Sequence, residues 1–571
     1  MKKEVKIYPR VIERIEDWPI YLLSKDRQNF VAEIDEETTS RILQKHKNDV
    51  SDLLVKTIYQ ERIRIKESPW KVDPPNERSF WNRISNKLIK KSLDRDDPES
   101  KAVNEEILHK IIHRYSEEIV GTFQIRTFKF AQRFLTAFFN RIFNAVVGKS
   151  ISAMFRGKRN LYERLNIVGD VDTVRELFKH GTVVVLPTHS SNLDSILVGY
   201  AMDQIMGLPS FSYGAGLNLY NFGPAAYYMN RLGAYRVDRR KKNAIYLETL
   251  KTMSRLSIQR GVNSLFFPGG TRSRSGEIEK DLKLGLLGTA VEAQRAIALG
   301  GSDKKVFLVP MVICYNSVLE APFLIEQHLR ITGKENYIRL KDEGTSVRGW
   351  FRFIWRFITT SSDITLSVGK PMDVLGNFVD SNGRSFDKNN NEIDVREYYI
   401  ANSGINEDRQ RENEYTKLLA DKLVERYQVE NVVFSSHLVA TAVFQMLLHE
   451  NPKLDIFGIL RLPTDEYIFP RKNVKEVIEQ MKNRLLDMEK EGKIRLDADI
   501  YEDSEHILKK GVWNLGIFHT VKPLRLTKQG DIYATSFRVL YFYHNRLVHY
   551  NLSKFVQWKG TEIEALKIVD D

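Results

Sequence analysis

Residues 182–198 read TVVVLPTHSSNLDSILV, and this stretch decides the fold. Its first part, Val183–Leu186, is apolar and β-branched, which is typical of a short buried strand. Its last three residues are apolar again, and they predict the beginning of a helix. Ser191 or Asn192 is a suitable helix N-cap, which places Asp194 in the first helical turn. A strand that leads through a tight loop into a helix is the repeating unit of α/β folds.

The same alternation of strand and helix continues along the chain on both sides of this stretch. Four runs of apolar and β-branched residues are expected as strands: Thr182–Leu186, Gly261–Phe267, Val306–Cys314 and Ile364–Val368. Helical stretches between them include Asn243–Gln259 and Leu282–Leu299. We therefore predict an α/β sheet covered by helices, with functional residues in the loops at strand ends.

The chain of 571 residues is too long for a single hydrophobic core, so several regions are expected. We predict a helical N-terminal region (1–120), a catalytic α/β domain (121–375), a polar linker (376–410) and a C-terminal region of helices and short strands (411–571). The linker is predicted from GNFVDSNGRSFDKNNNEIDVRE at 376–397, which is rich in Asn, Asp and Gly.

The charge balance favours an anionic partner. Lys and Arg (87) outnumber Asp and Glu (74), which gives a net charge of +13 and suits nucleic acid, anionic lipid or an acidic carrier. Ordinary solvated surface charge is the competing explanation. Cys314 is the only cysteine, so a disulfide framework and a cysteine-based zinc site are both excluded. We expect neither a metal nor a cofactor.

The sequence predicts contact with a membrane surface rather than a membrane-spanning helix. The N-terminus has no secretory signal, and no run of 18 or more apolar residues is present. Phe123–Phe155 and Trp350–Phe357 interleave aromatic residues with Arg and Lys, which suits the headgroup boundary of an anionic bilayer. Packing of these segments as core helices is the alternative. A peripheral location on the cytoplasmic face is therefore expected.

The chemistry of the chain is predicted from the loop that follows the first of these strands. His189 lies just beyond the strand end, and the tight turn can fold Asp194 back onto it. A carboxylate on one imidazole nitrogen fixes the tautomer and leaves the other nitrogen free to take a proton from an alcohol. A capped loop with a surface histidine is the competing interpretation. Ser190 and Ser191 are expected to cap backbone groups rather than to act as nucleophiles.

Three further segments strengthen this prediction by their order along the chain. Gly233–Arg240 gathers several cations on a strand-like segment, and Phe267–Gly276 follows a predicted strand with a Gly-Gly pair and two arginines. Glycine allows close backbone approach, and a guanidinium group can donate two parallel hydrogen bonds to phosphate oxygens. Leu308–Val312 is a further buried strand. Singly, these segments have ordinary explanations as a basic edge, a turn and a core strand.

In this order, the segments resemble the four blocks of the phospholipid/glycerol acyltransferase superfamily, over about Leu161–Asp373. His189 and Asp194 match its catalytic His-x4-Asp block, and Val309-Pro310 matches the fourth block. The resemblance implies a mixed sheet flanked by helices, the glycerol-phosphate acyltransferase fold. It also implies a set of phosphate- and substrate-binding residues: Arg239, Gly269, Gly270, Thr271, Arg272 and Arg274.

The C-terminal region is similar to the extension of long bacterial-type membrane glycerol-3-phosphate acyltransferases, at Ser436–Ala442 and Leu540–His549. This implies acyl transfer from acyl-CoA or acyl-carrier protein to the sn-1 hydroxyl of glycerol 3-phosphate in phospholipid synthesis. The family's third block usually carries a glutamate before its glycine, whereas Pro268-Gly269-Gly270 has none. Glu277 is the nearest acid, and we do not assign it that role.

Other functions compete with this one. An active site of this kind can also acylate 1-acylglycerol 3-phosphate or dihydroxyacetone phosphate, and the residues of the third block favour 1-acylglycerol 3-phosphate. A non-catalytic membrane lipid-binding protein is favoured by the missing glutamate and disfavoured by the intact His189 and Asp194. Nucleic-acid binding is not expected, because no recognition motif or basic stripe accompanies the positive charge.

Overall fold

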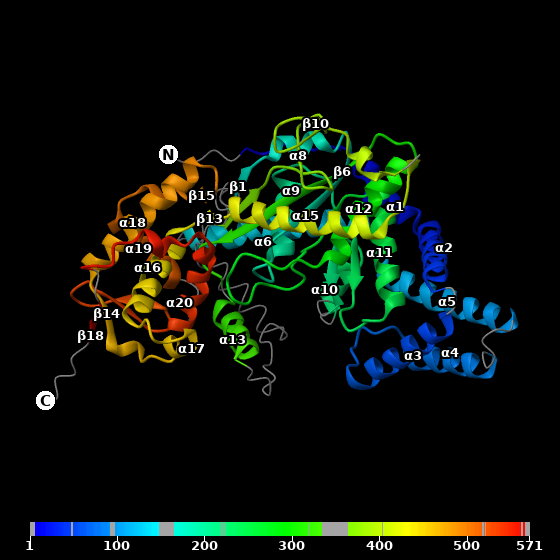
Figure 1. Cartoon of the computed structure of the whole chain (residues 1–571), viewed down its shortest axis with the longest axis horizontal. Coiled ribbons are helices and arrows are strands. Elements are labelled where there is room, and N and C mark those ends of the chain that lie inside the picture. Colours follow the sequence, from blue (N-terminus) through cyan, green and yellow to red (C-terminus); the bar gives the residue numbers. More distant parts are fainter. Residues whose placement is uncertain are drawn as a thin grey trace.

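The computed structural model describes residues 6–46, 49–91, 98–147, 165–217, 220, 223–318, 320–333, 364–401, 404–516, 519, 521–560 and 563–565. The aromatic segment Trp350–Phe357 lies outside these residues, as do positions 148–155. The N-terminal helices lie at one end of the molecule and the C-terminal region at the other, with the central sheet between them (Figure 1).

The N-terminal region is helical, as predicted. Its α-helices are α1 (Pro19–Lys25), α2 (Arg27–Lys45), α3 (Val50–Glu67), α4 (Glu77–Lys91) and α5 (Pro98–Ile119). The apolar residues of α5 recur every three or four positions, at Ile107, Leu108, Ile111 and Ile112, and all four are fully buried. They belong to one core with residues of α2 and of α11 (Ala244–Gln259), so the helices pack onto the central domain through this face.

The central sheet contains β1 (Leu165–Gly169), β2 (Gly181–Pro187), β3 (Ser212–Gly216), β4 (Ala234–Val237), β5 (Ser264–Leu265), β6 (Lys305–Tyr315) and β7 (Ile364–Val368). The spatial order is β1-β7-β6-β2-β5-β3-β4. All neighbouring strands are parallel except β6 and β7, which are antiparallel. This mixed sheet flanked by helices confirms the predicted fold class.

Helices cover both faces of the sheet: α6 (Ile125–Val147), α8 (Val171–Leu177), α9 (Asp194–Gln204), α10 (Gly223–Met229), α11, α12 (Leu284–Leu299), α13 (Ala321–Thr332) and α15 (Arg409–Val429). Alternate side chains of β2 point to opposite faces of the sheet. Val183 and Val185 belong to the core that contains α9, whereas Val184 and Leu186 belong to the core that contains α12 and α15. A strand buried on both faces explains the continuous apolar run in the sequence.

The strand predicted at Gly261–Phe267 is shorter than expected, since β5 contains only Ser264 and Leu265. Its first residues instead close the end of α11, where the Gly261 and Val262 N–H groups donate to the Ile258 and Ser257 carbonyls, and Asn263 Oδ1 accepts from the Val183 backbone N–H at 2.9 Å. The strands predicted at 306–314 and 364–368 agree with β6 and β7 to within a residue at each end.

The polar segment 376–397 contains a small antiparallel sheet rather than irregular loop alone. Its strands are β8 (Phe378–Val379), β9 (Ser385–Phe386) and β10 (Glu392–Ile393). Aspartates hold the turns between them; Asp380 Oδ1, for example, accepts from the backbone N–H groups of Asn382 and Arg384 at 2.9 Å. The high Asn and Asp content of the segment therefore encodes tight turns.

The C-terminal region is mixed α and β, as predicted. Its helices are α16 (Ser435–Glu450), α17 (Ile456–Ile459), α18 (Arg471–Lys490), α19 (Ser504–Gly516) and α20 (Phe537–His544), and its 3₁₀ turns include η8 (Asn545–Tyr550). Its strands are β13 (Val432–Val433), β14 (Tyr467–Phe469), β15 (Arg495–Leu496), β16 (Leu524–Leu526), β17 (Ile532–Ala534) and β18 (Glu564–Ala565), while β11 (Ile400–Ala401) and β12 (Gly404–Ile405) pair with each other in the preceding linker. Strands β14, β16, β17 and β18 form one antiparallel sheet in the order β16-β17-β14-β18.

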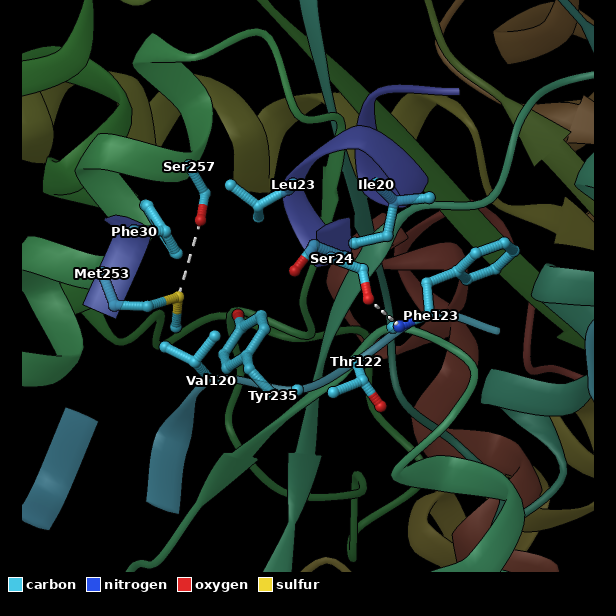
Figure 2. Close-up of a pocket in the computed structure, with 13 residues that line it drawn as sticks. Ile20, Leu23, Ser24, Phe30, Val120, Thr122, Phe123, Tyr235, Met253 and Ser257 are labelled. Atoms are coloured by element: carbon cyan, nitrogen blue, oxygen red, sulfur yellow. Dashed lines mark hydrogen bonds between the residues drawn. The ribbon is translucent and has the colours of Figure 1, made fainter. Parts of the chain in front are cut away.

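A small cavity marks the junction between the N-terminal helices and the sheet (Figure 2). Its volume of about 20 Å³ is enough for one water molecule. Beside it, the backbone N–H of Phe123 donates to Ser24 Oγ at 2.8 Å, which joins α1 to the start of α6. Within the part of the chain described here, no helix combines the length and the apolar composition required to cross a bilayer.

Candidate active site

The predicted site residues gather at one edge of the sheet. β2 ends at Pro187, two residues before His189, and its parallel neighbour β5 ends at Leu265, just before the Gly-rich loop. Because the carboxyl ends of parallel neighbours face the same way, the two loops leave the sheet side by side. β4 ends at Val237, so Arg239 leaves the sheet at this edge as well.

The structure brings His189 and Asp194 together as the sequence predicts. His189 Nδ1 lies 2.8 Å from Asp194 Oδ2, and the imidazole retains 21% of its exposure while the carboxylate is fully buried. Asp194 Oδ1 accepts a hydrogen bond from the Tyr315 hydroxyl at 2.5 Å. Because Asp194 binds Nδ1, the other ring nitrogen of His189, Nε2, is left for proton transfer.

The helix N-cap differs from the prediction. α9 begins at Asp194 itself; Leu193 is the N-cap residue and makes no capping hydrogen bond through its side chain, so neither Ser191 nor Asn192 caps the helix. Instead, Asp194 Oδ2 accepts from the backbone N–H groups of Ser190 and Ser191, at 2.6 and 2.8 Å. One carboxylate therefore shapes the loop and orients the imidazole.

The Gly-rich loop is bonded directly to the His189 loop. The backbone N–H of Ser273 donates to the His189 carbonyl at 2.8 Å, and the Phe267 ring lies 4.4 Å from the imidazole, centre to centre. Gly269 and Gly270 form the turn that follows Phe267, and Gly270 has a φ of +75°, where glycine is favoured. Thr271 follows, exposed to solvent.

The three predicted arginines have different surroundings. Arg272 lies 3.7 Å from the largely buried Glu320, whose Oε1 accepts from the Asn192 backbone at 3.0 Å. Arg239 and Arg274 lie near each other: burial, followed by the charge of Arg274, lowers the pKa of Arg239. Within the described residues, no carboxylate forms an ion pair with either of them, so two like charges lie close together there without a paired carboxylate. Such a pair is suited to an anion.

Arg240, by contrast, is a structural residue. Its guanidinium donates to Asp238 at 2.7 Å and to Asp73 at 2.5 Å, and it stacks over the Trp70 ring at 4.0 Å. These partners come from β4's own loop and from the segment between α3 and α4. The structure thereby separates two adjacent arginines that the sequence alone presents as equivalent.

Sequence reasoning missed three residues of the site: Tyr315, Glu320 and Glu279. Glu279 Oε1 accepts from the His189 backbone N–H at 2.7 Å, and burial raises the pKa of this carboxyl to about 7. Burial also raises the pKa of Glu320, with the charge of Arg272 opposing the rise. No spacing rule distinguishes Glu279 from its neighbour Glu277, whereas Tyr315 is predictable as the last residue of the strand beside β2.

The C-terminal region forms hydrogen bonds with two loops of the site. Asn545 Nδ2 donates to the Ser275 carbonyl at 2.9 Å, and the Val318 backbone N–H donates to the Tyr543 hydroxyl at 2.9 Å. Both contacts come from the segment Leu540–His549 that resembles long acyltransferases. This segment holds the loop that carries Arg272 and Arg274 and the loop that follows β6. No cluster of three or more potential metal ligands occurs among the residues that the structure describes.

Comparison with known proteins bears on the same residues. A family model described as Acyltransferase matches residues 155–314, which include both His189 and the Gly-rich loop. The chain is also similar to a glycerol-3-phosphate acyltransferase of Pseudoalteromonas translucida (strain TAC 125), with 25% identity over 340 residues. This similarity covers 58% of the present chain and 37% of the relative, so the chain spans well under half of the relative's length.

Proposed function

We propose, from the membership of this chain in the phospholipid/glycerol acyltransferase superfamily, that it is a glycerol-3-phosphate O-acyltransferase. The observation that carries the proposal is geometric. An imidazole braced by a buried carboxylate stands at the same sheet edge as the guanidinium groups of Arg239 and Arg274, which pair with no carboxylate of the residues that the structure describes. A base beside an anion site fits an acceptor that carries both a hydroxyl and a phosphate.

In this mechanism His189 acts as general base. Nε2 takes the proton of the sn-1 hydroxyl while that oxygen attacks the carbonyl carbon of the acyl thioester. The imidazolium that forms is stabilised by Asp194, whose Oδ2 lies 2.8 Å from Nδ1. When the tetrahedral intermediate collapses, the C–S bond breaks, His189 returns the proton to the thiolate, and ester and free thiol leave. No covalent acyl-enzyme is required.

The arginines position the acceptor. Arg239 and Arg274 bind the phosphate, and Arg272, held beside the His189 loop by Glu320, completes the clamp. Fixing the phosphate orients the hydroxyl towards Nε2 and converts an encounter in solution into an oriented reaction. Both acyl-CoA and acyl-carrier protein are polyanions, and the net charge of +13 suits either donor.

The test is an assay of purified protein with each donor and each acceptor, with products identified by mass spectrometry. Glycerol 3-phosphate is expected as the preferred acceptor over lysophosphatidate and dihydroxyacetone phosphate. His189→Ala should abolish turnover, whereas His180→Ala, which alters an exposed histidine, should retain it. Full activity in His189→Ala would remove the histidine from the mechanism, and no product with any pair would favour a lipid-binding protein.

A surface of α6 and α10 is proposed to rest on anionic lipid. Phe130, Phe134 and Tyr227 are each more than half exposed, and Phe130 stacks on Tyr228 at 5.9 Å. The cations of this surface are Arg126, Lys129, Arg133 and Arg231. Exposed aromatic rings with a cationic border fit a headgroup region. The start of the segment is core instead, since Phe123 is 2% exposed.

Vesicle flotation tests this surface. Full-length protein should float with anionic vesicles at low salt, and Phe130→Ser/Phe134→Ser should reduce the floating fraction. Phe555→Ser is the matched control, because Phe555 is 49% exposed beside Arg484 in the C-terminal region. Equal flotation of the double variant and the wild type would refute the assignment of this surface.

A further inference from the structure

The carboxyl group of Glu279 occupies the place where a side chain at position 269 would stand. A Cβ added to Gly269 would lie 2.6 Å from Cδ and Oε2 of Glu279 and 3.0 Å from its Oε1. The two distances of 2.6 Å are shorter than real Cβ contacts, so a side chain at 269 and the Glu279 carboxyl group cannot both keep these positions. Gly269 is not among the glycines with positive φ, so its backbone would accept an ordinary residue. A residue with a Cβ at this position would therefore displace the Glu279 carboxyl group, whereas the backbone conformation itself allows one.

The same carboxyl group reaches the loop of the proposed base. Oε1 accepts from the backbone N–H of His189 at 2.7 Å, and the backbone N–H of Gly269 also donates towards the carboxyl. One side chain from the segment before α12 thus bonds to the loop that follows β2 and packs against the loop that follows β5. The His189 backbone is thereby held at both ends, since its carbonyl accepts from Ser273.

We propose that Glu279 is a positioning residue of this site, which fixes the His189 loop against the Gly-rich loop by accepting from the His189 backbone and packing against Gly269. It supplies from position 279 the carboxyl group that the third block lacks at position 269. The inference rests on the proposed acyltransferase function, because its principal readout is turnover. Glu279 does not touch the reacting atoms; it acts through the position of the imidazole.

The electrostatics of Glu279 agree with a functional origin. Burial raises its pKa to about 7, the N–H groups of His189 and Gly269 oppose the rise, and the charge of Asp194 adds to it. Its Oε2 is buried with no hydrogen-bond partner in the described part of the chain. A buried carboxyl group with an unpartnered oxygen destabilises the fold, and such groups are concentrated at functional sites. The ionised form is the stronger acceptor, so the tie should weaken as the pH falls below 7.

The first experiment measures kcat and KM of substituted full-length proteins. Glu279→Ala should lower kcat about 100-fold with little change in either KM, because a small displacement of a base affects the chemical step. Glu279→Gln keeps an acceptor oxygen and should recover most of the activity. In Glu279→Gln, kcat should no longer fall with the titration of residue 279 near pH 7, because the glutamine does not ionise. Glu277→Gln is the matched control; Glu277 pairs with Lys280 and should not matter.

The second experiment moves the carboxyl group. Gly269→Glu alone should be inactive, because its side chain collides with Glu279. In Gly269→Glu/Glu279→Ala the new glutamate has the vacated space, and kcat should rise above that of either single variant. A side chain with a purely structural role would not show this reciprocal rescue. A double variant no better than both singles, with wild-type melting temperature, overturns the inference.

A third measurement does not depend on turnover. Amide hydrogen exchange of the peptide that contains His189 should be about tenfold faster in Glu279→Ala, since loss of this hydrogen bond lowers the local opening free energy by about 1.4 kcal/mol. If wild type proved inactive but exchange still rose in Glu279→Ala, the proposed function would be refuted, whereas the role of Glu279 in holding the His189 loop would stand. Unchanged exchange together with unchanged kcat would defeat the role of Glu279 alone.

Discussion

Asp194→Asn is the substitution that tests the proposed chemistry most directly. In the structure Asp194 Oδ2 accepts from His189 Nδ1 and from the backbone N–H groups of Ser190 and Ser191, while Oδ1 accepts from Tyr315. An asparagine keeps one acceptor oxygen for the first three donors. Its amide group can donate to the Tyr315 hydroxyl, which then acts as acceptor. The loop should therefore keep its shape while the negative charge is lost.

The size of the effect follows from the charge that is removed. During proton transfer the imidazole becomes cationic, and its charge centre lies roughly 4 Å from that of the carboxylate. At an effective dielectric constant near 20, two unit charges at that distance attract by about 4 kcal/mol. Since each 1.36 kcal/mol corresponds to a factor of ten, kcat should fall about 1000-fold. The KM for glycerol 3-phosphate should change little, because the arginine clamp is untouched.

The assay follows thiol release from the acyl thioester at saturating acceptor, with the melting temperature as a folding control. Tyr315→Phe is the companion variant: it removes one donor to Asp194 but leaves the charge, so its loss of kcat should be far smaller. If Asp194→Asn retained kcat within about threefold of wild type, less than 1 kcal/mol, the carboxylate would not stabilise an imidazolium and the reasoning would be refuted.

Three further predictions concern binding, stability and pH. Arg239→Ala and Arg274→Ala should each raise the KM for glycerol 3-phosphate about 10- to 100-fold, because each loses a hydrogen bond to a charged group. Arg260→Ala is the control at an exposed arginine, and its KM should stay at the wild-type value. Arg64→Leu should cost about 3–5 kcal/mol in urea unfolding, because buried Arg64 pairs with Glu61, Asp73 and Glu77; a loss below about 1 kcal/mol would contradict this account. Burial holds the pKa of His437 near 3 and that of His544 near 4, so both stay neutral in the folded state and take up protons only on unfolding below about pH 6.5. Stability should therefore fall as the pH drops, by about 1.4 kcal/mol for each histidine between pH 7.5 and 5.5, which urea titrations at the two values will measure.

The sequence by itself predicted the α/β class, the central strand β2 and the principal pair of the site. An apolar run such as that of β2 predicts a strand buried on both faces, because it is short and rich in β-branched residues. His189 and Asp194 are five residues apart in one tight turn, so their contact is local and the chain order predicts it. Their proximity to Arg272 was also predictable, since strand ends in a parallel sheet share an edge.

Tertiary structure alone decided which charged groups are free and which are bound. Arg239 and Arg240 are adjacent in the chain, yet only Arg240 meets Asp73, a partner from a region more than 160 residues away. Glu279 rather than Glu277 enters the site for a similar reason: its carboxyl fits the space left by Gly269, and that space is created by two loops packing side by side. Pattern and spacing encode contacts within a turn or along a strand. Contacts between loops depend on how whole elements pack, so no local stretch of sequence contains them.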